Sequence, residues 1–137
     1  MSLWISRMRE RAKRALAITL LVIVAVVAVV GAGSRVWEES RVEVSPEEAR
    51  ERIRQGKYDV IVDVRTPEEW ARGHRADAVH VPIGEFVTEF PRRVPRKDDR
   101  ILFVCRKGIR APAAALMAQK KGYRHVQAVV GDHDGLV

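Results

Sequence analysis

An uncharged run of 18 residues, ALAITLLVIVAVVAVVGA (15–32), limits what this chain can fold into more than any other feature. As an α-helix the run would be about 27 Å long, close to the roughly 30 Å thickness of the hydrocarbon core of a bilayer. A helix in a soluble core would carry polar residues at helical spacing, whereas Thr19 is the only polar residue here. The sequence therefore predicts one transmembrane helix near the N-terminus.

This apolar segment could be a membrane anchor that is retained or a signal peptide that is cleaved. A basic start, an apolar middle and Val30-Gly31-Ala32 would also suit a cleavable signal peptide, although the length of the run favours a membrane anchor. Five basic residues precede the run, and two follow it within the next 15 residues. The positive-inside rule then predicts a single-pass protein with its N-terminus in the cytoplasm and its domain on the extracytoplasmic side. A cleaved segment would make the domain periplasmic or secreted.

The net charge of +7 raises the question of nucleic-acid binding. Much of the excess, however, lies in residues 1–14, ahead of the apolar run. The remaining sequence shows no helix-turn-helix, aromatic-rich sheet or zinc-finger pattern. A single cysteine also excludes an intramolecular disulfide and a cysteine-cluster zinc site. We therefore expect neither a nucleic-acid partner nor a metal site.

The rest of the chain alternates between short apolar β-branched runs and helical patterns. We expect a basic cytoplasmic N-terminus (1–14), the membrane segment (15–32), a polar linker (33–41) and one domain (42–137). Strands are expected at 42–44, 59–64, 78–81, 101–104 and 126–130, with helices at 45–55, 66–72, 83–90 and 111–121 and a solvated loop at 91–100. This alternation predicts an α/β fold with a central, mostly parallel sheet flanked by helices.

The stretch CRKGIR (105–110) carries the only cysteine. Cys105 ends a predicted strand and precedes a predicted helix, and ligands bind at the carboxyl ends of parallel strands. The positive end of the helix, with Arg106, Lys107 and Arg110, should leave the thiol partly ionised and nucleophilic. Gly108 would let the loop curl into an anion-binding nest. The alternative is a small buried hydrophobe, but the cations and the glycine favour a reactive thiol.

Two motifs resemble those of the single-domain rhodaneses, over about residues 42–135. They are VIVDVRTPEEWARGHRADAVHVP (60–82) and Cys-x-x-Gly-x-Arg in CRKGIR. The resemblance implies a small rhodanese-like fold and a sulfurtransferase. Such an enzyme moves sulfane sulfur from thiosulfate or a persulfide donor to a thiol, cyanide or protein acceptor. Cys105 would carry the sulfur as a persulfide, so that no cofactor is implied.

The resemblance also implies roles for the neighbours of Cys105. The loop amides from Arg106 through Lys107, Gly108 and Ile109 to Arg110 would stabilise the persulfide. Arg106 and Lys107 would attract the anionic donor, and Arg110 would bind it or orient the loop.

Arg65, at the end of another predicted strand, is a further candidate for contact with the donor. The interpretation that we favour for Arg65 is a structural ion pair with Asp63 or Glu69.

Two other functions are open. A rhodanese-like domain could act as a binding or sulfur-carrier module on a protein partner. Related phosphatases and arsenate reductases use a loop one residue longer, wide enough for phosphate, and the six-residue loop here favours sulfur.

Overall fold

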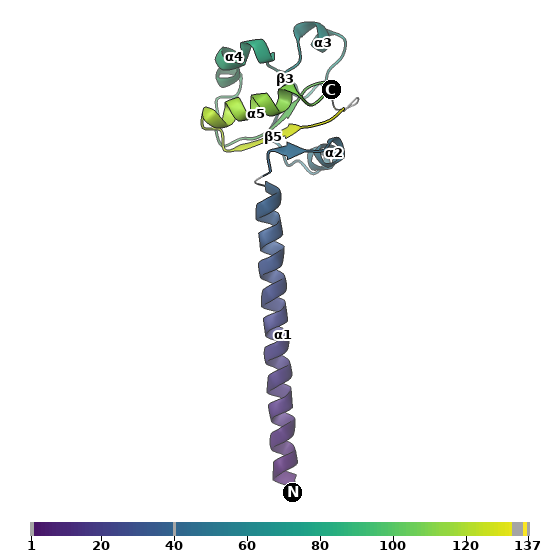
Figure 1. Cartoon of the computed structure of the whole chain (residues 1–137), viewed down its shortest axis with the longest axis vertical. Helices are drawn as coiled ribbons and strands as arrows, with labels where there is room; N and C mark the ends of the chain where they lie inside the picture. The colour runs from purple at the N-terminus through teal and green to yellow at the C-terminus, as the bar shows by residue number, and fades with distance from the viewer. Residues whose placement is uncertain (1, 40, 133–135, 137) are drawn as a thin grey trace. The chain divides into compact units, whose positions relative to one another are not determined.

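The structure, a computed structural model, describes residues 2–39, 41–132 and 136 and divides the chain into two compact units, 1–40 and 41–137 (Figure 1). The second unit contains a five-stranded sheet in the order β1-β5-β4-β2-β3. Its strands are β1 (Glu43–Val44), β2 (Val60–Asp63), β3 (Ala78–His80), β4 (Arg100–Val104) and β5 (His125–Val129). Every pairing between these strands is parallel, which confirms the predicted fold class.

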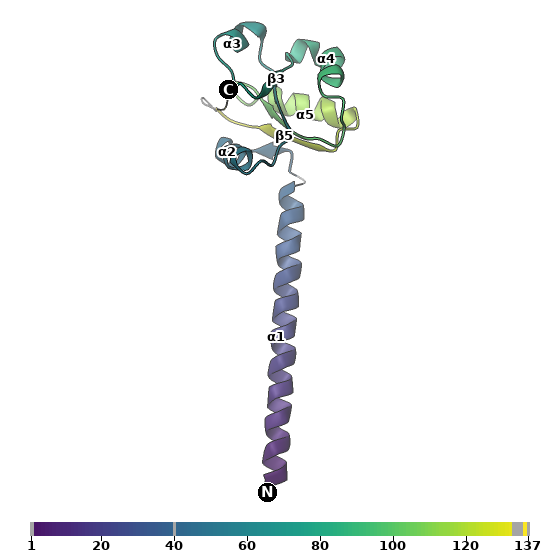
Figure 2. The same cartoon turned by 180° about the vertical axis from the view of Figure 1, so that it is seen from behind.

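Helices cover both faces of this sheet, and α2 lies on the face opposite α4 and α5 (Figures 1 and 2). The helices are α2 (Pro46–Arg54), α3 (Pro67–Ala71), the 3₁₀ turn η1 (Ile83–Glu85), α4 (Phe86–Arg93) and α5 (Arg110–Lys120). Side chains of β4 alternate between the two faces, as a pleated strand requires. Ile101 and Phe103 join the core beside α4 and α5, whereas Leu102 and Val104 join the core beside α2.

Two helices begin where the sequence predicts a helix start, at residues 45 and 66, and both starts are capped by a side chain. The Ser45 hydroxyl accepts a hydrogen bond from the N–H of Glu48 (3.2 Å) at the start of α2. At α3, the Thr66 hydroxyl accepts from the Glu69 N–H (3.3 Å), and the Glu69 carboxylate accepts from the Thr66 N–H (2.9 Å). This reciprocal pair is a capping box. It fixes Glu69 near the carboxyl edge of the sheet, because α3 follows β2.

The solvated loop expected at 91–100 is wrong at both ends. Helix α4 continues through Pro91 to Arg93, and Arg100 already belongs to β4. Phe86, Phe90 and Val94 recur every four residues and are buried, so their burial holds the backbone helical despite the hydrogen bond that Pro91 cannot donate.

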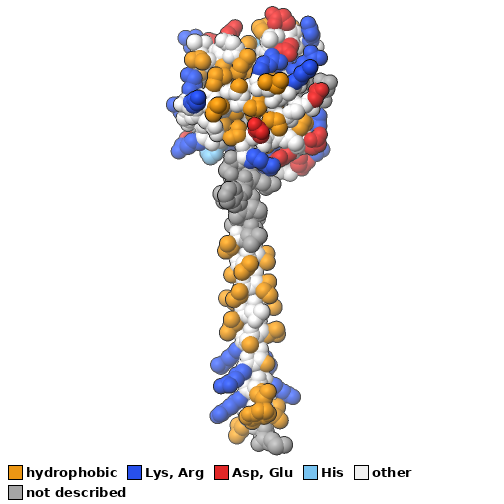
Figure 3. Space-filling view, in the orientation of Figure 1, with side chains coloured by type: hydrophobic (Ala, Val, Ile, Leu, Met, Phe, Trp, Pro, Cys, Tyr) orange, Lys and Arg blue, Asp and Glu red, His pale blue; other side chains and the backbone are white. Residues whose placement is uncertain are grey.

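The first unit is one helix, α1 (Ser2–Glu39). Within its stretch Leu3–Val29, the most apolar 18-residue window has a mean hydropathy of 2.3 and is not buried within the chain, so the helix is long and apolar enough to cross a membrane. Hydrophobic side chains line the middle of α1, and Lys and Arg side chains gather near its N-terminal end (Figure 3). The Thr19 hydroxyl donates to the Ala15 carbonyl (2.9 Å), which satisfies it within the helix. The helix also includes residues 33–39, where we expected a polar linker, since propagating a helix costs less than nucleating one.

Candidate active site

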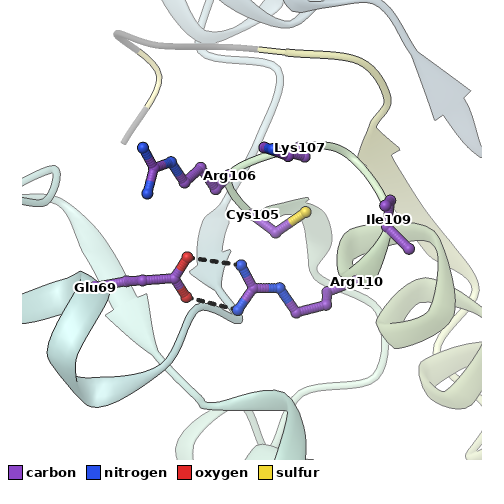
Figure 4. A pocket seen from close by; sticks show the side chains of 6 residues that line it. All are labelled: Glu69, Cys105, Arg106, Lys107, Ile109 and Arg110. Atoms are coloured by element: carbon purple, nitrogen blue, oxygen red, sulfur yellow. Dashed lines mark hydrogen bonds and ion pairs between the residues drawn. The ribbon is translucent and has the colours of Figure 1, made fainter.

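Cys105 lies in the loop between β4 and α5, at the carboxyl edge of the sheet. Its side chain is fully buried, yet it lines a pocket of about 330 Å³ together with Glu69, Arg106, Lys107, Ile109 and Arg110 (Figure 4). A reagent must therefore reach the sulfur through this pocket. The register aligns Asp63 of β2 with Val104 of β4, so that the residues following both strands meet at the same edge.

The N-terminus of α5 is directed at the sulfur. The Ala111 N–H donates a hydrogen bond to Cys105 Sγ (3.4 Å). Within the described part of the chain, the N–H groups of residues 106–109 have no hydrogen-bond acceptor, and no side chain caps α5. Unpaired N–H groups at a helix N-terminus stabilise an anion. The loop therefore provides the electrostatic setting for a sulfur anion at Cys105.

Gly108 is required by both conformation and space. Its φ of +67° is in the left-handed region. A Cβ at this position would lie 2.2 Å from the backbone nitrogen of Gly131 and 2.8 Å from the backbone of Val130. The loop thus packs directly against the backbone that follows β5. The sequence predicted the curl of the loop but not this contact.

Arg110 forms a two-point ion pair with Glu69 of α3. The distances are 2.6 Å from Nη1 to Oε2 and 2.9 Å from Nη2 to Oε1 (Figure 4). These two hydrogen bonds lower the pKa of the Glu69 carboxyl to about 2. They also raise the pKa of the Arg110 guanidinium. From the sequence, Glu69 was expected only as a possible partner for Arg65. The pattern Thr66-Pro67-Glu68-Glu69 is typical of a helix start, but a contact between Glu69 and a loop residue 41 positions away cannot be read from it.

The pocket rim carries two cations and an apolar side chain. Arg106 and Lys107 are exposed, and neither makes an ion pair or side-chain hydrogen bond with any described residue. Ile109 is 77% exposed. The charge of Arg110 is offset by Glu69, so among the described residues Arg106 and Lys107 supply the positive charge at the pocket that no carboxylate pairs with.

The structure does not bring Arg65 into the pocket lining. Its side chain is buried, pairs with Asp63 (Nη2 to Oδ2, 2.8 Å) and donates to the Gly73 carbonyl (2.8 Å). This is the structural ion pair with Asp63 that the sequence favoured. It ties the end of β2 to the turn after α3.

Two histidines near α3 also have structural partners. Trp70 stacks on His74, at a ring-centroid distance of 3.6 Å, and on His80, at 4.4 Å. His74 Nδ1 lies 2.9 Å from the Trp70 carbonyl, and His80 Nε2 lies 2.9 Å from the Arg65 carbonyl. Neither ring lines the pocket. In the residues that the structure describes, no three His, Cys, Asp or Glu side chains are grouped to hold a metal ion.

A parallel α/β domain with a cysteine loop closed by a helix N-terminus has the architecture of a rhodanese. Residues 45–135 match the family model of the rhodanese-like domain. The chain belongs to the rhodanese-like domain family, which confirms the resemblance seen in the two motifs.

Named relatives include sulfurtransferases and a provisionally designated sulfur carrier. Thiosulfate sulfurtransferase PspE of Escherichia coli is 30% identical over 73 residues, which cover 53% of this chain and 70% of PspE. YrkF of Bacillus subtilis, provisionally a sulfur carrier protein, is 32% identical over 88 residues, 64% of this chain and 46% of YrkF. This chain thus spans less than half of YrkF. Among solved structures, the human single-domain sulfurtransferase TSTD1 superimposes with a TM-score of 0.58 at 26% identity, over 67% of this chain and 91% of TSTD1.

Proposed function

We propose that this protein is a membrane-anchored sulfurtransferase in which Cys105 carries sulfane sulfur as a persulfide. One observation carries the proposal: Cys105 Sγ accepts the Ala111 N–H at the N-terminus of α5, in a pocket whose rim holds Arg106 and Lys107, two cations that pair with no described residue. A helix N-terminus and neighbouring cations favour the thiolate, which is the nucleophilic form of cysteine.

The reaction would proceed in two displacement steps. The Cys105 thiolate attacks the outer sulfur of thiosulfate, the bond between the two sulfurs of thiosulfate breaks, and sulfite leaves with the electron pair. An acceptor thiolate or cyanide then attacks the outer sulfur of the persulfide and releases the Cys105 thiolate. The sulfur is transferred without an external oxidant or reductant, and no cofactor is needed because the cysteine itself holds the sulfur.

The residues around the pocket would have different roles in the reaction. The amides of residues 106–110 and the end of α5 stabilise the terminal persulfide sulfur, which is anionic. Arg106 and Lys107 attract the doubly charged donor. The six-residue loop supports sulfur rather than phosphate as the transferred group.

Intact mass spectrometry tests this proposal directly. The full chain, purified in detergent, should gain one sulfur (about 32 Da) after incubation with thiosulfate and lose it to cyanide. Cys105→Ser should show no gain. If folded wild-type protein gained no sulfur from thiosulfate or from a low-molecular-weight persulfide, the proposal would be wrong.

A second candidate is a sulfur carrier that delivers to a protein acceptor. The exposed Ile109 at the pocket rim favours it, since an apolar side chain beside the thiol suits a protein surface better than a small anion. Persulfide formation with slow turnover to cyanide and fast turnover to a protein thiol would support the carrier. Fast turnover to cyanide and to small thiols would support the enzyme.

We further propose that residues 15–32 anchor the chain, with residues 1–14 in the cytoplasm and residues 42–137 forming the catalytic domain on the other side. The length and hydropathy of Leu3–Val29 support the anchor, and the five basic residues before the run support the orientation.

A further inference from the structure

The three cations of the loop at residues 105–110, called here the active loop, are of two kinds. Arg106 and Lys107 are exposed and have no described partner. Arg110 is partly buried, and both of its terminal nitrogens bond to the Glu69 carboxylate. A guanidinium held in this way presents little net charge to a substrate. Its position suits a structural contact better than donor binding.

Glu69 is itself held firmly by local structure. Its Oε2 accepts both the Thr66 N–H (2.9 Å) and Arg110 Nη1 (2.6 Å), and its backbone N–H donates to the Thr66 hydroxyl. The carboxylate is thus fixed at the start of α3 before it reaches across to the loop. A bidentate pair between arginine and a carboxylate also fixes the relative orientation of its partners.

Arg110 is the first residue of α5, and the next residue donates its N–H to the sulfur. Any shift of Arg110 is therefore transmitted across one peptide bond to the Ala111 N–H···Sγ contact. The ion pair is the only hydrogen-bonded or ionic side-chain contact in the described chain that ties this loop to α3.

We propose that Glu69 is a positioning residue for sulfur transfer: through Arg110 it holds the N-terminus of α5 on the sulfur of Cys105, while Arg106 and Lys107 meet the charge of the donor. This inference rests on the proposed function. It assigns Arg110 to loop orientation rather than to donor binding.

Glu69→Gln tests the inference, because the amide keeps the size of the side chain and one acceptor oxygen but loses the two-point pair. In the full chain in detergent, the saturating rate of persulfide formation from thiosulfate should fall roughly 10- to 100-fold. The thiosulfate concentration at half-saturation should not rise. An unchanged saturating rate, or a loss only in the half-saturation concentration, would overturn the inference.

Asp59→Asn is a matched control. Asp59 makes a two-point pair with Arg100 (Nε to Oδ2, 3.0 Å; Nη2 to Oδ1, 2.8 Å) at the opposite, amino edge of the sheet. This variant also replaces one carboxylate by an amide, but it should leave the saturating rate within about twofold of wild type. An equal loss of rate in Asp59→Asn and Glu69→Gln would show a general loss of stability and overturn the inference.

Arg110→Lys provides a second variant in case Glu69→Gln does not fold. Lysine keeps the charge but not the two-point geometry. We expect Arg110→Lys to lower the saturating rate as much as Glu69→Gln does, without raising the half-saturation concentration of thiosulfate. If Arg110 bound the donor, that concentration would rise while the saturating rate changed little.

Amide hydrogen exchange separates this inference from the proposed function. A peptide covering residues 105–111 should exchange at least about tenfold faster in Glu69→Gln than in wild type or Asp59→Asn. If wild type formed no persulfide, the proposed function would fail, yet faster exchange would still show that Glu69 holds the loop. Unchanged exchange would overturn the inference whether or not sulfur is transferred.

Discussion

Gly108 joins the active loop to the last part of the domain through a contact that only glycine allows. Two independent constraints require glycine here. The φ of +67° disfavours any side chain because of the local backbone, and an added Cβ would lie 2.2 Å from the backbone nitrogen of Gly131, in a distant segment. A side chain here would have to displace the backbone of residues 130–131, which cannot rotate away as a flexible side chain could.

Gly108→Ala should therefore lower the free energy of unfolding by about 2 kcal/mol or more, from left-handed strain and from the displaced backbone. It should also slow persulfide formation more than the stability loss explains. Urea denaturation and the intact-mass assay check both effects. Gly84→Ala is the control, because a Cβ at Gly84 meets nothing within 4 Å. Equal stability of the two variants would contradict this account of the contact.

Arg106 and Lys107 are expected to act through charge rather than shape, since both are exposed and lack a described partner. Arg106→Gln/Lys107→Gln should raise the half-saturation concentration of thiosulfate about tenfold at low salt, and less at high salt, where the field is screened. Lys120→Gln/Lys121→Gln removes the same charge from the other end of α5. A similar rise in the half-saturation concentration of thiosulfate in this control would mean that the net charge of the protein matters, rather than the position of Arg106 and Lys107 at the pocket.

Acid titration provides a separate measurement of the Glu69–Arg110 pair. The pair lowers the pKa of Glu69 to about 2 in the folded chain, below its ordinary value of 4.5. The pair thus stabilises the fold fully above pH 4.5, and its contribution is lost as pH falls toward 2. The difference in free energy of unfolding between wild type and Glu69→Gln should be constant from about pH 7 to about pH 5 and narrow below. A difference that stayed the same down to about pH 2 would contradict the ion pair.

At the scale of elements, α4 shows burial outweighing helix propensity. Phe90 stacks on Phe86 at a ring-centroid distance of 4.4 Å and contacts Phe103 and Tyr123 at 5.4 and 4.7 Å. Tyr123 in turn donates its hydroxyl to the Val94 carbonyl, just past the end of the helix. These contacts keep α4 helical beyond Pro91.

Phe90→Ala should destabilise the domain by about 3–5 kcal/mol, because it empties the centre of this aromatic cluster. Chemical denaturation of the full chain in detergent would measure the change. Val87→Ala is the control, since Val87 lies on the same helix but is 61% exposed, and its effect should stay within about 0.5 kcal/mol. A loss below about 1 kcal/mol at Phe90 would mean that the cluster is not the core of this face.

The sequence predicted the elements that local chemistry determines. Ser45 and Thr66 marked helix starts, since their hydroxyls cap the helices in the structure. Short apolar runs marked β2 and β4, because both strands are largely buried. The end of α4 was missed, because Pro91 favours a break locally and the burial of Val94 depends on a face that only the folded sheet creates.

The candidate site was predictable only in part for the same reason. Cys105 and the cations that follow it are contiguous, so their proximity could be read from the chain. The pairing of Glu69 with Arg110, the contact of Gly108 with Gly131 and the stacking of Trp70 on His80 join distant segments. These contacts depend on strand order and register, which the sequence pattern alone did not determine.

At the scale of the whole molecule, a charged substitution tests the proposed membrane anchor. Val24→Arg places a charge in the middle of the uncharged run 15–32, which costs about 2.5–3.5 kcal/mol for a helix in a bilayer. It should shift the chain out of the carbonate-resistant membrane fraction, whereas Val24→Leu should not. Equal membrane fractions for the two variants would contradict a spanning helix. The intact mass of the membrane-bound wild type separates an anchor, which retains residues 1–32, from a cleaved signal, which loses them.

The strand order has a consequence for how the protein is made. β1 follows α1 directly in the chain, yet its hydrogen-bonded neighbour in the sheet is β5, the last strand to be synthesised. The domain therefore cannot complete its sheet until His125–Val129 has left the ribosome. Helix α1 leaves the ribosome well before β5, so it becomes available to the insertion machinery while the sheet behind it is still incomplete. If the domain lies on the extracytoplasmic side, as proposed, it would cross the membrane as an unfolded chain. Folding, and packing of the Cys105 loop against Gly131, would then follow that passage.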